Sequence, residues 1–168
     1  KETNNLVLLI GKTEGHIDQS LFARIILDEK NGPPPEINLF NEKNNGETLL
    51  QLIKDNYVKS AHDISLGGIL TAVSKMCIKG NKGIEFNKPK YSMSEIEYLF
   101  SEDQGRYIIE INPSDLEQVT KILEKNSVHF EELGKIIDKH LIINQKTKVT
   151  IDELKSYNTS WLNNFMSS

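Results

Sequence analysis

The first third of the chain alternates short apolar runs with polar segments that end them. A continuous aliphatic run over residues 6–10 stops at Gly11, and its length and flanks predict a buried strand. Apolar positions at helical spacing predict helices over residues 20–27 and 47–55. The Asn-Gly-Pro-Pro-Pro segment at residues 31–35 ends the first helix, because proline cannot continue one. The pattern therefore predicts one strand followed by two helices.

The middle of the chain carries the clearest helical pattern. Residues 57–62 predict a strand, which leads through a polar segment into a helix that ends near Lys79. One stripe of this helix is apolar at the three- and four-residue spacing of a core-facing helix, and it consists of Leu66, Ile69, Leu70, Val73, Met76 and Cys77. A short strand follows over residues 83–86. Cys77 lies on the stripe, so we expect a buried small apolar residue rather than a nucleophile.

The second half predicts further helices and strands in alternation. A helix is expected over residues 93–100, a strand over 106–111, and β-structure over 128–137 and 140–144. Two capping-box patterns predict helix starts, the first from Ser114 to Glu117 and the second from Thr150 to Glu153. We expect the helix after Ser114 to end near Lys125.

The last helix carries Leu154, Tyr157, Trp161 and Phe165 on one side, so Trp161 and Phe165 are expected to anchor a core or an interface. Helices alternate with short strands along the whole chain. This alternation predicts an α/β or α+β sandwich, with helices packed on a mixed β-sheet. We expect residues 1–168 to form a single domain.

Composition narrows the class of protein. The chain has 168 residues, enough for a core without disulfides, and a net charge of −4 with both signs interspersed, so no nucleic-acid surface is expected. No apolar run approaches the ~20 residues that a membrane helix needs, so no membrane partner is expected. Cys77 is the only cysteine, which favours a reducing compartment such as the cytoplasm. The first residue is not Met, which suggests a fragment or a processed product.

The most informative polar segment lies where a strand passes into the best-patterned helix. It contains His62, Asp63, Ser65, Gly67 and Gly68. A helix N-terminus attracts anions through its N–H groups, glycines allow close approach, and Asp63 or Ser65 could cap the helix. One interpretation is a phosphate or metal-phosphate site. The other is a capped helix that packs closely through its glycines, and the spacing alone favours this second interpretation.

A second polar cluster precedes the strand at residues 106–111. It comprises Glu102, Asp103, Gln104 and Arg106. The carboxylates could bind Mg²⁺, and the group could contact an amide or a phosphate of a ligand. The alternative, which the residues alone favour, is an Arg106–Glu102 ion pair that ties the loop to the sheet.

Other candidates for chemistry are weaker. Residues 11–16, Gly-Lys-Thr-Glu-Gly-His, are superficially similar to a phosphate loop, but they lack the Walker spacing, so a structural role is favoured. His16, His129 and His140 have no helical ligand partner four residues away, and no metal site is expected there. We assign no catalytic residue in this chain.

Several segments resemble one enzyme family in the same order along the chain. Residues 61–70, Ala-His-Asp-Ile-Ser-Leu-Gly-Gly-Ile-Leu, resemble the Ala-His-Asp-Ile/Val-Ser-Asp/Glu-Gly-Gly-Leu motif of phosphoribosylformylglycinamidine synthases. Residues 99–107, Leu-Phe-Ser-Glu-Asp-Gln-Gly-Arg-Tyr, resemble a second motif of that family. Residues 9–15, 33–37 and 76–85 are similar to further family segments. The resemblance is to the family's C-terminal domain, which is like that of aminoimidazole ribonucleotide synthase.

Two positions depart from the family pattern. Residues 17–20 read Ile-Asp-Gln-Ser where the family often has Leu-Gly-Gly-Ser, so a close backbone approach at Asp18 and Gln19 is not expected to be kept. Leu66 stands where the family usually has an acid, and a carboxylate that could bind metal is therefore missing.

The resemblance implies an ATP-dependent ligase of purine biosynthesis. The family converts formylglycinamide ribonucleotide, ATP and glutamine-derived ammonia to formylglycinamidine ribonucleotide, ADP and phosphate, through phosphorylation of an amide oxygen followed by attack of ammonia. It implies ATP and Mg²⁺ as cofactors of the full-length enzyme, with none bound tightly by this piece, which we expect to be inactive alone. The second C-type domain, which this chain resembles, borders the degenerate site of the family, where an auxiliary nucleotide can bind.

The resemblance also implies partners and leaves alternatives open. The expected partners are the N-terminal and central domains of the same enzyme, a separate glutaminase subunit and a small accessory subunit. The first alternative is a purely structural domain whose motifs support packing. The second is a related enzyme with the same domain, such as aminoimidazole ribonucleotide synthase, selenophosphate synthetase or a hydrogenase-maturation dehydratase, although the Glu-Asp-Gln-Gly-Arg string at residues 102–106 argues against it.

Overall fold

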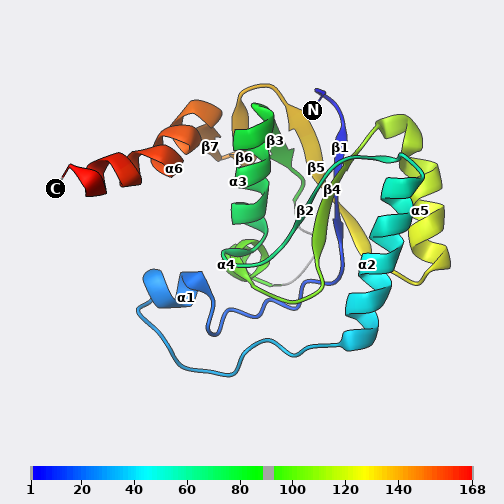
Figure 1. Ribbon diagram of the computed structural model, residues 1–168, viewed down its shortest axis with the longest axis horizontal. Helices are drawn as coiled ribbons and strands as arrows, with labels where there is room; N and C mark the ends of the chain where they lie inside the picture. The colour runs from blue at the N-terminus through cyan, green and yellow to red at the C-terminus, as the bar shows by residue number, and fades with distance from the viewer. Residues whose placement is uncertain (1, 89–92, 168) are drawn as a thin grey trace.

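A mixed β-sheet forms the centre of the molecule (Figure 1). The computed structural model describes residues 2–88 and 93–167, and within these ranges seven strands pair in the order β2-β4-β1-β5-β3-β6-β7. The strands are β1 (Leu6–Ile10), β2 (Val58–Asp63), β3 (Gly83–Phe86), β4 (Tyr107–Ile111), β5 (Phe130–Ile137), β6 (His140–Ile143) and β7 (Thr147–Thr150). Neighbouring strands run antiparallel, except that β3 and β6 are parallel. The predicted mixed sheet is confirmed, whereas β7 was not predicted.

Helices cover both faces of this sheet. They are α1 (Leu21–Ile25), α2 (Leu39–Lys54), α3 (Gly68–Gly80), α4 (Glu95–Phe100), α5 (Leu116–Lys125) and α6 (Ile151–Met166), with a 3₁₀ turn, η1, at Pro113–Asp115. One apolar cluster joins α3 and α4 to the sheet, and a second joins α2 and α5 to it. The result is three layers, with the sheet between two groups of helices.

The alternation of side chains along β1 explains why both faces are apolar. Val7 and Leu9 belong to the cluster beneath α3, whereas Leu8 and Ile10 belong to the cluster beneath α2 and α5. Successive side chains of a strand point to opposite faces. A strand buried on both faces must therefore be a continuous aliphatic run, which is the pattern that residues 6–10 show.

Helix α2 begins eight residues before the predicted start. Asn38 caps it by accepting a hydrogen bond from the Asn41 backbone N–H at 3.0 Å. Asparagines and Gly46 fill the first turns and have low helix propensity, so the sequence pattern hid this part of the helix. Leu49 and Leu52, further along, supply its buried contacts.

The two predicted capping boxes have different outcomes. Thr150 and Glu153 exchange hydrogen bonds at the start of α6, as predicted, with the Glu153 N–H donating to Thr150 Oγ1 at 3.1 Å. The prediction for Ser114 was wrong, because Ser114 lies inside η1 and Asn112 caps that turn. Pro113 fixes the first position of the turn and displaces the start of α5 to Leu116.

Helix α6 starts in the core and then leaves the body of the molecule (Figure 1). Ile151 is buried, but Trp161 and Phe165 are exposed, so they do not anchor the core of the described chain. Cys77 is buried on α3, as predicted. Among the described residues, no helix combines the length and the apolar character that crossing a membrane requires.

Two leucines of α2 provide a matched test of this packing. Leu52 is 0% exposed and Leu50 is 55% exposed. We expect Leu52→Ala to lower the free energy of unfolding by about 2–5 kcal/mol, because it leaves a cavity beneath the sheet. Leu50→Ala is expected to change it by less than about 0.5 kcal/mol. Urea unfolding followed by circular dichroism measures both values, and equal losses would contradict the assigned face of α2.

Candidate functional site

The two polar clusters predicted from the sequence meet at the start of α3. The Gly67 backbone N–H donates to Glu102 Oε1 at 2.8 Å. The same oxygen accepts from the Leu21 backbone N–H, also at 2.8 Å, at the first residue of α1. One carboxylate therefore satisfies N–H groups at two helix starts, where intrahelical acceptors are lacking. A negative charge is also favoured there by the helix dipole.

Two adjacent glycines at this junction allow α3 to lie close to the neighbouring backbone. Gly67 is the N-cap residue of α3 with φ of 84°, and it makes no side-chain cap, so the predicted capping by Asp63 or Ser65 was wrong. Gly68 also has a positive φ of 67°, and a Cβ there would lie 2.6 Å from the Ser101 carbonyl oxygen. The paired glycines thus let α3 approach the backbone of residues 99–101.

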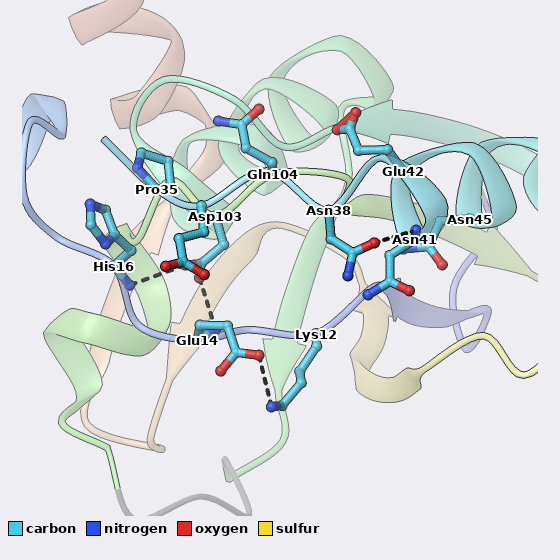
Figure 2. A pocket seen from close by; sticks show the side chains of 11 residues that line it. Lys12, Glu14, His16, Pro35, Asn38, Asn41, Glu42, Asn45, Asp103 and Gln104 are labelled. Atoms are coloured by element: carbon cyan, nitrogen blue, oxygen red, sulfur yellow. Dashed lines mark hydrogen bonds and ion pairs between the residues drawn. The ribbon is translucent and has the colours of Figure 1, made fainter. Parts of the chain in front are cut away.

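Asp103 organises the loop that follows β1. Its carboxylate accepts hydrogen bonds from the backbone N–H groups of Glu14, Gly15 and His16 at 3.0, 3.1 and 3.2 Å. Figure 2 shows the bonds from Glu14 and His16. Consecutive N–H groups of this kind form an anion-binding concavity. The loop that is superficially similar to a phosphate loop therefore encloses a carboxylate of the chain itself.

Arg106 supports the same loop from beneath. Its side chain is 0% exposed and donates to Thr13 Oγ1 at 3.0 Å, to the Ser101 carbonyl at 2.8 Å and to the Asp103 carbonyl at 3.2 Å. Burial lowers the pKa of Arg106, and the Asp103 carboxylate, 3.7 Å away, offsets part of that effect. The predicted Arg106–Glu102 pair was wrong, because the guanidinium pairs with Asp103 and Glu102 faces the helix starts.

The remaining predicted residues face outward around the junction. Asp63 and Ser65 are exposed, His62 is half-buried, and His62 Nδ1 lies 2.5 Å from the Asp63 carbonyl oxygen. Leu66 is 61% exposed and precedes α3, so its predicted place on the core stripe was wrong. Gln104 is exposed as well. These side chains are available to a ligand or to another part of a larger protein.

A polar cleft of about 400 Å³ lies beside the Asp103 loop (Figure 2). Its walls come from the loop after β1, the segment before α2, the first turns of α2 and the turn before β4. The lining residues are Lys12, Glu14, His16, Pro35, Glu36, Asn38, Asn41, Glu42, Asn45, Asp103 and Gln104. The contribution of α2 was not predicted, although the closely spaced asparagines of residues 38–45 were a signal of polar function.

Several polar side chains of the cleft make hydrogen bonds or ion pairs within the chain. Asn45 is buried and donates to the Gly105 carbonyl at 2.9 Å, which ties α2 to the turn before β4. Lys12 pairs with Glu14 at 2.7 Å in solvent. Behind the wall, burial raises the pKa of Tyr107, and the charges of Glu42 and Asp63 raise it further. No group of three or more His, Cys, Asp or Glu residues placed to hold a metal ion occurs in residues 2–88 and 93–167.

Comparison with known proteins places these features in a family. The family model "AIR synthase related protein, C-terminal domain" matches residues 2–144. A phosphoribosylformylglycinamidine synthase subunit PurL from Pelagibacter ubique is 66% identical over 166 residues, which are 99% of this chain and 23% of that protein. The PurL subunit of Bartonella quintana is 36% identical over 98% of the chain and 22% of its own length. The chain thus spans about a quarter of the curated relatives it matches.

Solved structures show the same fold at low sequence identity. T. maritima PurL complexed with FGAR (formylglycinamide ribonucleotide) superposes with a TM-score of 0.73, at 20% identity, over 92% of this chain and 28% of that one. A chain of the HypE-HypF complex gives a TM-score of 0.60 at 15% identity, over 89% of this chain and 53% of that one. The fold is therefore shared by proteins with different names.

The same substitution, Gly→Ala, is expected to change the free energy of unfolding in opposite directions at two glycines. Gly68→Ala is expected to lower the free energy of unfolding by about 2–4 kcal/mol, because the new Cβ meets backbone and φ is positive. Gly46→Ala, in the interior of α2, is expected to raise it by up to about 1 kcal/mol, since the nearest atom lies 3.5 Å away. Thermal unfolding of both variants measures the pair. A tolerated Gly68→Ala would exclude the close approach of α3 to residues 99–101.

Proposed function

We propose that this chain, which belongs to the AIR synthase related proteins as their C-terminal domain, is part of a phosphoribosylformylglycinamidine synthase. The observation that carries the proposal is the 66% identity to a PurL subunit over 166 residues. The larger protein would convert formylglycinamide ribonucleotide, ATP and ammonia to formylglycinamidine ribonucleotide, ADP and phosphate. Because the chain is 23% of the length of that relative, the reaction is assigned to the whole protein.

The proposed chemistry needs an activated amide. The amide oxygen attacks the γ-phosphorus of ATP and ADP leaves; ammonia then adds to the amide carbon, and phosphate leaves with the former amide oxygen. No residue of this chain is assigned to bond making or breaking. The residues described here would hold a wall of a ligand site, because Asp103 and Arg106 fix the loop after β1 and Glu102 fixes the starts of α1 and α3.

Two sets of residues take different roles in this proposal. Glu102, Asp103, Arg106, Gly67 and Gly68 build the junction through contacts within the chain. A second set presents outward groups to an auxiliary nucleotide or to a neighbouring domain, and it consists of His62, Asp63, Ser65 and Gln104. A carboxylate such as Asp63 can accept hydrogen bonds from ribose hydroxyls.

The proposed cofactors and partners follow from the relatives. T. maritima PurL has been solved complexed with ATP and with ADP, which supports ATP as the cosubstrate here. The resemblance implies Mg²⁺ for the complete enzyme, and we assign no Mg²⁺ ligand among the residues of this chain. The "PurLQS" structure from T. maritima supports a glutaminase subunit and a small accessory subunit as partners. We place the enzyme in the cytoplasm on the same resemblance.

The proposed reaction is tested with the complete polypeptide that contains these residues. Purified protein is incubated with formylglycinamide ribonucleotide, ATP, Mg²⁺ and ammonium, and products are identified by mass spectrometry. We expect formylglycinamidine ribonucleotide and ADP in equal amounts, with both absent when the ribonucleotide is omitted. ATP hydrolysis that does not depend on the ribonucleotide, with no amidated product, would contradict the proposal.

Asp63 separates the ligand role from the structural alternative. Its side chain is 66% exposed, so Asp63→Ala in the complete protein is expected to change the free energy of unfolding by less than about 0.5 kcal/mol. Nucleotide affinity, measured by calorimetry, is expected to fall about tenfold through loss of a charged hydrogen bond. Glu124→Ala, an exposed carboxylate on α5, serves as the matched control and should change neither quantity. Unchanged affinity in Asp63→Ala would favour a purely structural junction.

A further inference from the structure

The outer half of α6 has an unusual composition for a helix in solvent. Residues 157–166 read Tyr-Asn-Thr-Ser-Trp-Leu-Asn-Asn-Phe-Met and contain no Asp, Glu, Lys or Arg, although charged residues make up 26% of the chain. Solvated helix faces normally carry charges. Depletion of charge together with Trp, Tyr, Phe and Met is typical of the centre of a protein interface.

The aromatic residues of this segment form one stripe. Tyr157, Trp161 and Phe165 recur every four residues and are 78%, 63% and 70% exposed. The stripe begins at Leu154, which packs against the core cluster beneath α3. The Trp161 and Phe165 rings lie 6.4 Å apart between centroids. The apolar stripe that packs on the core at the start of α6 therefore continues into the exposed outer half of the helix.

The side chains of this stripe stay mostly exposed in the part of the chain that the structure describes. Figure 1 shows α6 running away from α3, with the C-terminus at the far end. Isolated helical segments shorter than ~12–15 residues are marginal in water, so the outer half needs tertiary contacts to be stable. Large aromatic side chains at four-residue spacing are the usual anchors of a helix that docks in a groove.

We propose that the outer half of α6 docks into an apolar groove on the preceding part of the same longer polypeptide. The proposal rests on the proposed function, in which residues 1–168 are a C-terminal domain within a larger chain. The 66% identical relative matches over 99% of this chain, α6 included, and about three quarters of its length lies outside the match. That remaining length is large enough to supply the groove.

A second copy of the chain fits the stripe less well as the occupant. A stable complex between separate proteins buries about 800 Å² per partner, with some 20–30 residues a side, which exceeds half of one helix. Docking within one polypeptide avoids the entropic cost of bringing two molecules together, so a few aromatic anchors suffice. The small size of the stripe therefore favours the same chain.

Photo-crosslinking in the complete polypeptide tests this contact directly. Trp161 is replaced by the photoreactive amino acid benzoylphenylalanine, and in a matched control Thr159, exposed on the opposite side of α6, is replaced in the same way. After irradiation and digestion, we expect position 161 to be joined to a peptide that precedes residue 1, in a species with the mass of one chain. Position 159 should give at least tenfold less of this product.

Each other outcome overturns the proposal. A crosslinked species with the mass of two chains would assign the stripe to a second copy, and crosslinks confined to residues 1–168 or absent altogether would leave it solvated. Hydrogen exchange provides a second test that does not need the photoreactive residue. The amides of residues 157–166 should be protected in the wild-type protein. The double variant Trp161→Ala, Phe165→Ala should lose that protection, whereas the control Ser156→Ala, Thr159→Ala should keep it. The proposed function is judged separately: if position 161 crosslinks as expected but the unmodified protein fails to amidate the ribonucleotide, the proposed function is refuted and the docking stands.

Discussion

The junction of three chain segments depends on two adjacent carboxylates. Glu102 accepts hydrogen bonds from the first N–H of α1 and from the N-cap of α3, and Asp103 accepts three from the loop after β1. Backbone N–H groups that are partly shielded from water need acceptors, and these two carboxylates supply them. The arrangement places two negative charges where N–H dipoles converge, and the buried Arg106 pairs with one of them, the Asp103 carboxylate.

This junction limits what the surface can bind. The start of α3 would attract a phosphate if it were open, but Glu102 already fills that position with a carboxylate of the chain. A ligand would therefore contact either the surface around the junction, where His62, Asp63 and Gln104 face outward, or the cleft beside the Asp103 loop. Such a surface fits the proposal that this domain forms one part of a larger enzyme.

The sequence was most informative where periodicity and backbone chemistry agree. The doubly buried strand β1, the helix α3 and the capping box at Thr150 were predicted because each has a strong local pattern. The start of α2 was missed because its first turns are polar and are held by Asn38 and by tertiary contacts of Asn45.

The site was predicted in outline but not in its pairings. The sequence marked both polar motifs, yet it could not tell that Arg106 would face Asp103 while Glu102 faced two helix starts. Those choices depend on contacts across more than 80 positions, such as that between Leu21 and Glu102. The same limit applies to Leu66, whose spacing fits the α3 stripe although the backbone turns at Gly67 before the helix begins.

The structural role of Glu102 is tested most directly by hydrogen exchange in the complete protein. In Glu102→Ala the amides near Leu21 and Gly67 should exchange at least about tenfold faster, since a charged acceptor is lost. Glu117→Ala, an exposed carboxylate on α5, should leave them unchanged. Unchanged exchange at both helix starts in Glu102→Ala, together with loss of nucleotide affinity, would show that Glu102 serves a ligand and would contradict the account.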